Sequence, residues 1–144
     1  MNVPDFLDTN IFVYAHDDSD VRKQRIAQDL LTRAVQGEFV ASPQTLAEFS
    51  ATLLLKSLSP FTPDEVIGIL DVLSPIRIIT PDHGMIRRAV EANRAYGIHF
   101  YDGMIVAAAE RGGCERIWSE DFNAGQKYFG VKVTNPFVVS LNRD

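Results

Sequence analysis

Four acidic residues stand at positions from which their side chains could share one metal site. Asp8 directly follows a short apolar stretch, and Asp121 follows another near the end of the chain. Asp102 precedes seven residues without a polar side chain, and Glu48 lies inside a partly apolar segment. Carboxylate oxygens suit hard ions such as Mg²⁺ or Mn²⁺. Two such ions about 4 Å apart can activate water and stabilise the leaving oxygen when a phosphodiester bond is hydrolysed.

Each of the four carboxylates also has an ordinary structural explanation. Asp8 and Asp102 could cap helices, Asp121 could belong to a turn, and Glu48 could be a solvated helix residue. Asp102 is the hardest to explain in this way, because a helix that is apolar on every side is buried. A carboxylate at the start of a buried helix costs free energy unless it is capped, paired or metal-bound. The four residues together therefore favour a metal site more strongly than any one of them does alone.

The elements that must position these residues alternate between strands and helices. Short apolar runs rich in Val, Ile or Phe predict strands at residues 3–7, 38–41, 76–80 and 116–119, with a weaker one at 132–134. Strands separated by helices require right-handed crossovers, which give a parallel sheet with helices on both faces. Because ligands gather at the carboxyl ends of the strands in such sheets, Asp8 and Asp121 are predicted at the functional edge.

Helix boundaries are marked by capping residues, prolines and glycines. Five signals occur in chain order: Ser19 or Asp20 before a helix that stops at Gly37, Ser42-Pro43, the capping box Thr62-Pro63-Asp64-Glu65, Thr80-Pro81-Asp82 before a helix that stops at Gly97, and a helix from about Asp102 to Gly112-Gly113. The fourth of these helices is expected to have one apolar face made of Met85, Ile86, Ala89 and Val90.

The bulk properties of residues 1–144 fit one globular domain. The formal net charge of −5 disfavours a general electrostatic binder of nucleic acid. Without the four candidate ligands the charge becomes −1, from 15 acidic and 14 basic residues, so this objection is mild. The single cysteine, Cys114, excludes an internal disulfide, and we see neither a signal peptide nor an apolar run of the roughly 18 residues that a membrane span needs. We expect a cytoplasmic protein with no membrane partner.

Four short motifs occur in order over nearly the whole chain: Leu7-Asp8-Thr9-Asn10, Leu46-Ala47-Glu48-Phe49, Phe100-Tyr101-Asp102-Gly103 with the apolar run after it, and Ser119-Glu120-Asp121-Phe122. In this order and spacing they resemble the PIN domain, and in detail the VapC-type toxins of bacterial toxin–antitoxin pairs. Each motif alone is weak, whereas the four together are fairly specific. Gly103 stands where many members of the family have alanine, which is a small departure.

The resemblance implies a three-layer α/β/α sandwich with a central parallel sheet of four to five strands. It implies Mg²⁺- or Mn²⁺-dependent endoribonuclease activity, an RNA substrate, homodimers and inhibition by a small antitoxin protein. The residues it implies are the acidic quartet Asp8, Glu48, Asp102 and Asp121, supported by Thr9, Asn10 and Ser119. The segment Leu53-Leu54-Leu55 and the helix at residues 66–73 agree with a homodimer, because they carry more apolar surface than one helical face needs.

Other classes of protein remain open. One is an RNA-processing nuclease outside a toxin pair, and another is a non-catalytic RNA- or protein-binding module that keeps the fold. A phosphate-transfer domain is disfavoured, because Asn10 stands where haloacid phosphatases have a second aspartate and Leu7 precedes Asp8 where receivers have an acidic pair. Neither G-x-G-x-x-G nor G-x-x-x-x-G-K-[ST] occurs, which disfavours a nucleotide-binding fold.

Several further polar residues have weaker functional interpretations. His99 could be a general base, although a structural or surface role is commoner for a histidine in such a position. Six basic residues could contact phosphates, although a charged helix face is usually just solvated: Arg22, Lys23, Arg25, Arg87, Arg88 and Arg94.

Overall fold

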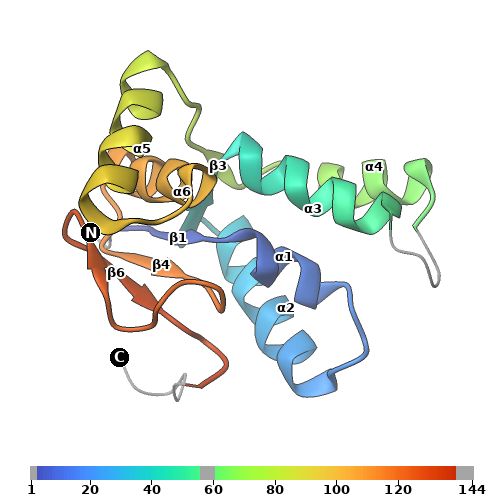
Figure 1. Ribbon diagram of the computed structural model, residues 1–144. Helices are drawn as coiled ribbons and strands as arrows, with labels where there is room; N and C mark the ends of the chain where they lie inside the picture. Colours follow the sequence, from blue (N-terminus) through green and yellow to red (C-terminus); the bar gives the residue numbers. More distant parts are fainter. Residues whose placement is uncertain (1–2, 56–60, 139–144) are drawn as a thin grey trace.

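The fold is built on a mostly parallel sheet that brings distant segments of the chain together. The computed structural model describes residues 3–55 and 61–138. Six strands in these ranges lie in the order β3-β2-β1-β4-β6-β5 (Figure 1). They are β1 (Asp5–Leu7), β2 (Phe39–Ala41), β3 (Arg77–Ile78), β4 (Arg116–Trp118), β5 (Lys127–Tyr128) and β6 (Val131–Thr134). Every neighbouring pair is parallel except β5 and β6, which are antiparallel.

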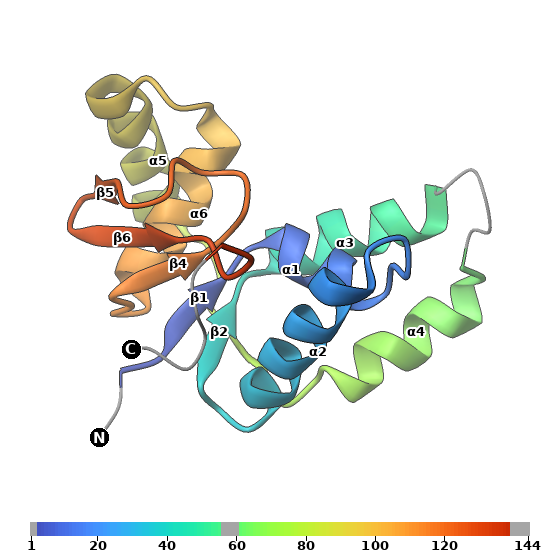
Figure 2. The same ribbon diagram turned by 90° about the horizontal axis from the view of Figure 1, so that it is seen from below.

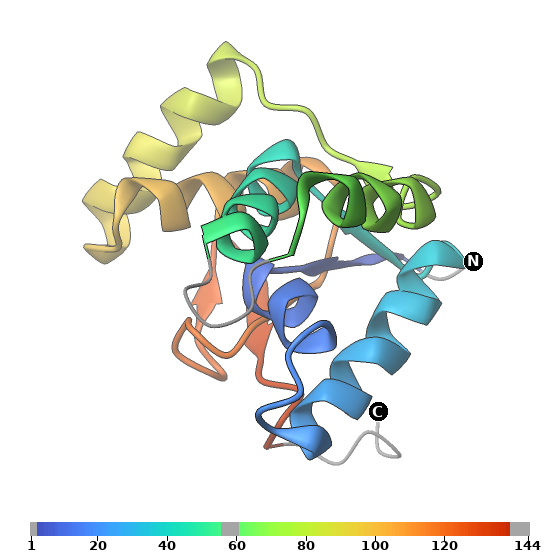
Figure 3. The same ribbon diagram turned by 90° about the vertical axis from the view of Figure 1, so that its right-hand side faces the viewer.

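Helices cover both faces of this sheet, as the alternating pattern predicts. In the described residues they are α1 (Thr9–Ala15), α2 (Val21–Val35), α3 (Pro43–Leu55), α4 (Pro63–Val72), α5 (His83–Tyr96) and α6 (Phe100–Arg111). Successive strand residues point to opposite faces, so Leu7 packs with α1–α4 while Phe6 packs with α5 and α6. Figure 2 shows the two groups of helices on opposite sides of the sheet, and Figure 3 shows the molecule with α3 and α4 in front. The expected three-layer α/β/α sandwich is confirmed.

The capping residues predicted from the sequence begin the helices at the expected places. Asp20, rather than Ser19, caps α2 by accepting a hydrogen bond from the backbone N–H of Lys23. Thr62 and Glu65 form the reciprocal capping box of α4. Asp82 caps α5 through the N–H of Met85, and Gly97 ends that helix at φ 68°, a left-handed conformation that glycine adopts without strain.

Four details of the expected secondary structure were wrong or missing. The helix α6 begins at Phe100, two residues before Asp102, because the side chain of His99 accepts a hydrogen bond from the N–H of Tyr101 and caps the helix. The seven-residue helix α1 and the two-residue strand β5 were not foreseen. Both are too short to show a hydrophobic period. The strand β3, Arg77–Ile78, is also shorter than the strand predicted at residues 76–80.

The apolar face expected on α5 was only half right. Met85 and Ala89 are buried, but Ile86 and Val90 are 48% and 55% exposed, and Ala92 is buried instead. Ala89 faces α6, where Gly103 lies directly against its backbone. A Cβ atom at Gly103 would be 2.6 Å from the carbonyl oxygen of Ala89. The two helices therefore pack backbone to backbone at a point where only glycine fits.

Exposed apolar side chains occur on α3 and α4, the two segments whose sequences carry more apolar residues than one helical face needs. Leu53 and Val66 are buried, whereas Leu55, Ile67 and Val72 are 80%, 56% and 69% exposed. The homodimer inferred partly from this excess stays a prediction. Among the described residues, no helix is long and apolar enough to cross a membrane.

Candidate metal centre

Two of the candidate carboxylates lie at the carboxyl edge of the sheet, next to each other. Asp8 directly follows β1, and Asp121 lies three residues beyond the end of β4. Because β1 and β4 are adjacent and parallel, with Leu7 opposite Trp118, their ends meet. The hydroxyl of Ser119 donates a hydrogen bond of 2.8 Å to Oδ2 of Asp8. The side chain of Asp8 also accepts a 2.7 Å bond from the N–H of Thr9, so Asp8 is a helix cap as well as a member of the acidic group.

Asn10 links the two strand ends through a single amide group. Its Nδ2 lies 3.1 Å from the hydroxyl oxygen of Ser119 and 3.1 Å from Oδ2 of Asp121, with Oδ2 of Asp8 at 3.5 Å. Its Oδ1 accepts a bond of 3.1 Å from the backbone N–H of Glu120. The hydroxyl oxygen of Ser119 in turn accepts a bond of 3.0 Å from the N–H of Asp121. These bonds fix the relative positions of Asp8 and Asp121.

The other two carboxylates reach the same place from helices. Glu48 of α3 accepts a 2.8 Å bond from the hydroxyl of Thr9 at Oε1 and a 3.2 Å bond from the amide of Gln44 at Oε2. The same amide donates to the backbone oxygen of Tyr101 at 3.1 Å, which ties α3 to the first turn of α6, where Asp102 lies. Figure 1 shows the N-terminal ends of α1, α3 and α6 gathered at the end of β1.

The charges of Asp121 and Glu48 act on the other two carboxylates, Asp8 and Asp102. Burial, chiefly, raises the pKa of Asp8 from its usual 3.8 to about 6, and the charges of Asp121 and Glu48 add to the effect against the hydrogen bonds from Ser119 and Thr9. The pKa of Asp102 is also raised by burial and by the same two charges, while His99 opposes the shift. A cation bound between these carboxylates would offset the repulsion that contributes to the raised pKa of Asp8 and of Asp102.

The four carboxylates line one pocket of about 490 Å³, together with Asp17, Glu120 and the supporting residues Thr9 and Asn10. Within residues 3–55 and 61–138, no three His, Cys, Asp or Glu side chains are close enough to form a ready-made metal cage. The oxygen-only donor set nevertheless fits Mg²⁺ or Mn²⁺, because Mg²⁺ commonly keeps several of its waters and takes one or two carboxylates directly.

A second cluster beside the pocket was not found from the sequence. Oε1 of Glu120 accepts a 2.5 Å bond from the hydroxyl of Tyr14, and Oε2 accepts a 2.5 Å bond from the ammonium of Lys23. These bonds attach α1 and α2 to the loop that carries Asp121. Glu120 could have been suspected from its place beside Asp121, and Gln44 from its place one helical turn before Glu48. No sequence signal connects Lys23 to this loop.

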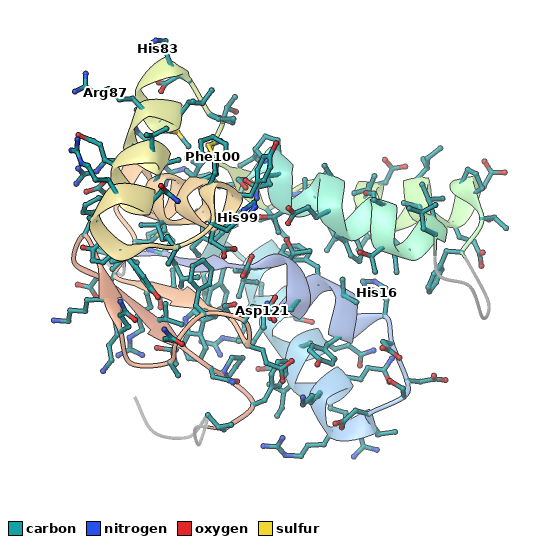
Figure 4. All side chains as sticks on the ribbon, viewed as in Figure 1. His16, His83, Arg87, His99, Phe100 and Asp121 are labelled. Carbon is teal, nitrogen blue, oxygen red and sulfur yellow. The ribbon has the colours of Figure 1, made fainter. Side chains whose placement is uncertain are left out.

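The remaining candidates have structural roles or lie elsewhere. His99 is the cap of α6, and Arg88 pairs with Glu110 and Glu91. Figure 4 shows Arg87 on α5, well away from Asp121, which lies near the start of α1. Cys114 is buried, and burial raises the pKa of its thiol to about 12, which leaves it unreactive at neutral pH.

A parallel α/β sandwich with acidic side chains at the carboxyl edge of its sheet is an arrangement that suits metal-assisted chemistry on phosphate esters. The sequence pattern of the PIN domain matches residues 6–129, and the chain belongs to the PIN domain family. PIN domains are typically metal-dependent nucleases. No curated protein sequence matches the chain.

Among solved structures, the chain is similar to one described as FitAB bound to an IR36 DNA fragment. The TM-score is 0.67 at 19% sequence identity, and the match covers 94% of this chain and 96% of that one. At this identity the likeness shows the fold alone. It agrees with the family assignment and with the sandwich described above.

Proposed function

We propose that this protein is a metal-dependent endoribonuclease in which Asp8, Glu48, Asp102 and Asp121 hold Mg²⁺ or Mn²⁺. The observation that carries the proposal is that four carboxylates from four separate segments line one pocket in a PIN domain. When bound, the metal would lower the pKa of a water molecule and neutralise charge on the leaving oxygen of the phosphodiester.

The residues around the carboxylates are proposed to hold them in place for this reaction. Asp8 has a pKa of about 6 and is therefore mostly ionised at neutral pH, as a metal ligand must be. Asn10 and Ser119 orient Asp8 and Asp121, while Thr9 orients Glu48. Loss of such a contact around a metal ligand typically lowers metal affinity or activity by about 10- to 100-fold.

We further propose that the chain is the toxin of a toxin–antitoxin pair, acting on RNA in the cytoplasm and inhibited by a small antitoxin protein. The four motifs that resemble VapC-type toxins support this role. FitAB, the structural relative, was solved bound to DNA, so DNA must be tested as a substrate beside RNA. A short upstream reading frame for a DNA-binding protein would favour the toxin over an RNA-processing nuclease.

The proposal is tested by incubating purified protein with total RNA, and separately with single- and double-stranded DNA, in Mg²⁺ or Mn²⁺ with and without EDTA. We expect cleavage of RNA alone, within the chain, leaving 3′-hydroxyl and 5′-phosphate ends. Asp121→Asn should reduce the rate at least about 100-fold. Asp29→Asn, which changes an exposed carboxylate of α2, should cleave like the wild type. RNA cleavage that persists in EDTA would overturn the metal mechanism.

A homodimer is part of the proposal, because exposed apolar residues of α3 and α4 would then be covered. They include Leu55, Ile67 and Val72. Light scattering at micromolar concentration should give twice the 16.1 kDa mass of one chain. A single species at the mass of one chain would contradict it.

A further inference from the structure

The acidic pocket lacks the groups that nucleic-acid sites usually use for affinity. Its lining in the described residues contains six carboxylates and no lysine, arginine or histidine. The ammonium of Lys23 is already paired with the carboxylate of Glu120. Contacts from basic residues to phosphates supply most of the non-specific affinity of proteins for nucleic acid. A substrate of this pocket therefore needs another source of binding free energy.

Two tyrosines line the pocket, and Tyr101 is the more exposed of the two. The hydroxyl of Tyr14 donates to Glu120, its ring packs edge-on against Phe137 at 5.0 Å, and the ammonium of Lys23 lies 4.9 Å from its centroid. Tyr101, in contrast, is 56% exposed and lines the same pocket as Asp102. Its large exposed ring therefore remains available to a ligand.

The ring of Tyr101 is held in one orientation by its neighbours. It stacks on the imidazole of His99, with centroids 5.8 Å apart and planes inclined by 24°, and it meets the ring of Phe100 edge-on at 5.2 Å. The backbone is anchored on both sides, since its N–H donates to Nδ1 of His99 and its carbonyl accepts from Gln44. An aromatic surface fixed before binding loses little conformational entropy when a ligand stacks on it. Figure 4 shows His99 and Phe100 at the start of α6.

We propose that Tyr101 is a base-stacking residue that selects an unpaired nucleotide of single-stranded RNA at the acidic pocket. The inference rests on the proposed nuclease function and names a feature of its substrate. Because Tyr101 and Asp102 line the same pocket, a base stacked on Tyr101 lies close to the carboxylates. Stacking of bases on aromatic side chains requires bases that are not stacked within a duplex, so paired RNA is excluded from this position.

The test measures binding of a fluorescent 12-nucleotide oligoadenylate by anisotropy in EDTA, beside the same strand paired with oligouridylate. The wild type should bind the single strand more tightly than the duplex. Tyr101→Ala should raise the dissociation constant for the single strand roughly 5- to 150-fold, as loss of one stacked base predicts. Tyr101→Phe, which keeps the ring, should bind like the wild type, and Val90→Ala, an exposed residue of α5, serves as the matched control.

Cleavage of the same strand in Mn²⁺ separates stacking from a merely structural role. Tyr101→Ala should raise KM and leave kcat near that of the wild type. Its melting temperature should fall by only about 5 °C or less, because the side chain is half exposed and loses only its contacts with His99 and Phe100. Tight binding by Tyr101→Ala, or equal binding of the duplex by the wild type, would overturn the inference while the nuclease proposal stands. Tyrosine-dependent binding without cleavage would support the inference and overturn the nuclease. A wild type that binds no RNA would overturn both.

Discussion

Replacing Gly103 by alanine tests whether the close packing of α5 on α6 is as tight as the structure shows. The added Cβ would lie 2.6 Å from the carbonyl oxygen of Ala89 and 3.2 Å from its Cα. The first distance is about 0.8 Å less than the 3.4 Å at which ordinary contact begins. The obstacle is backbone, so the two helices must move apart. Overpacking of this kind typically costs about 1–3 kcal/mol.

The same substitution has an opposing effect, which a second glycine isolates. Alanine favours a helix over glycine by about 1 kcal/mol. Gly68 in α4 has no atom within 4 Å of the place where a Cβ would be, so Gly68→Ala should show this gain alone. We therefore expect Gly68→Ala to stabilise the fold by about 0.5–1 kcal/mol and Gly103→Ala to destabilise it by about 1–2 kcal/mol.

Urea and thermal unfolding of both variants in EDTA give the measurement. A change of 1 kcal/mol corresponds to a shift of about 3–5 °C for a chain of this size, so the two melting temperatures should move in opposite directions. Movement of α6 also displaces Asp102, so RNA cleavage by Gly103→Ala should fall. If Gly103→Ala is as stable as Gly68→Ala, the helices are not in backbone contact and the argument is refuted.

Two further predictions concern the carboxylates without metal. In the folded protein Asp8 stays protonated up to a pH of about 6, whereas in the unfolded chain it ionises above 3.8. The wild type should therefore lose stability relative to Asp8→Asn as the pH rises from about 4 to about 6. The loss should be at most about 3 kcal/mol. Urea unfolding in EDTA at several pH values measures this difference, and a flat difference would contradict it. Asp102→Asn should abolish cleavage. In EDTA the variant should be as stable as the wild type or slightly more stable, because the pKa of Asp102 is raised in the fold. The gain should be less than about 1 kcal/mol, because the exposed side chain is partly screened by solvent. Mg²⁺ or Mn²⁺ should raise the melting temperature of the wild type more than that of Asp102→Asn. A clearly less stable variant with an unchanged metal response would mean that Asp102 stabilises the first turn of α6 and does not bind metal.

The sequence predicts the sheet and the edge at which the carboxylates meet, because those features depend on local patterns. An apolar run followed by Asp8, and another followed by Asp121, were sufficient to place both residues at the carboxyl ends of strands. The start of α6 was misplaced, because histidine is an uncommon cap and aspartate three positions later is a common one. The true cap, His99, was evident only from the hydrogen bond to Tyr101.

Other features depend on contacts between distant segments, which no local pattern contains. The hydrophobic period of α5 fits a face centred anywhere between Met85 and Val90. The contact of Ala89 with Gly103 decides that Ala92 is buried and that Ile86 and Val90 are exposed. The attachment of Lys23 to Glu120 likewise joins residues 97 positions apart. Such pairs are specified by the assembled fold.

The hydrogen bond between Ser119 and Asp8 joins residues separated by 111 positions, and this has a consequence for how the protein is made. Domains fold during synthesis from the N-terminus onward, and contacts between distant residues form slowly. A nascent chain on the ribosome that has exposed only β1, β2 and α3 carries Asp8 and Glu48 but lacks Asp102, Ser119 and Asp121. The pocket is then missing half of its carboxylates and the strand that orders Asp8. The acidic pocket of a chain that is still being translated thus stays incomplete until almost the whole chain has emerged.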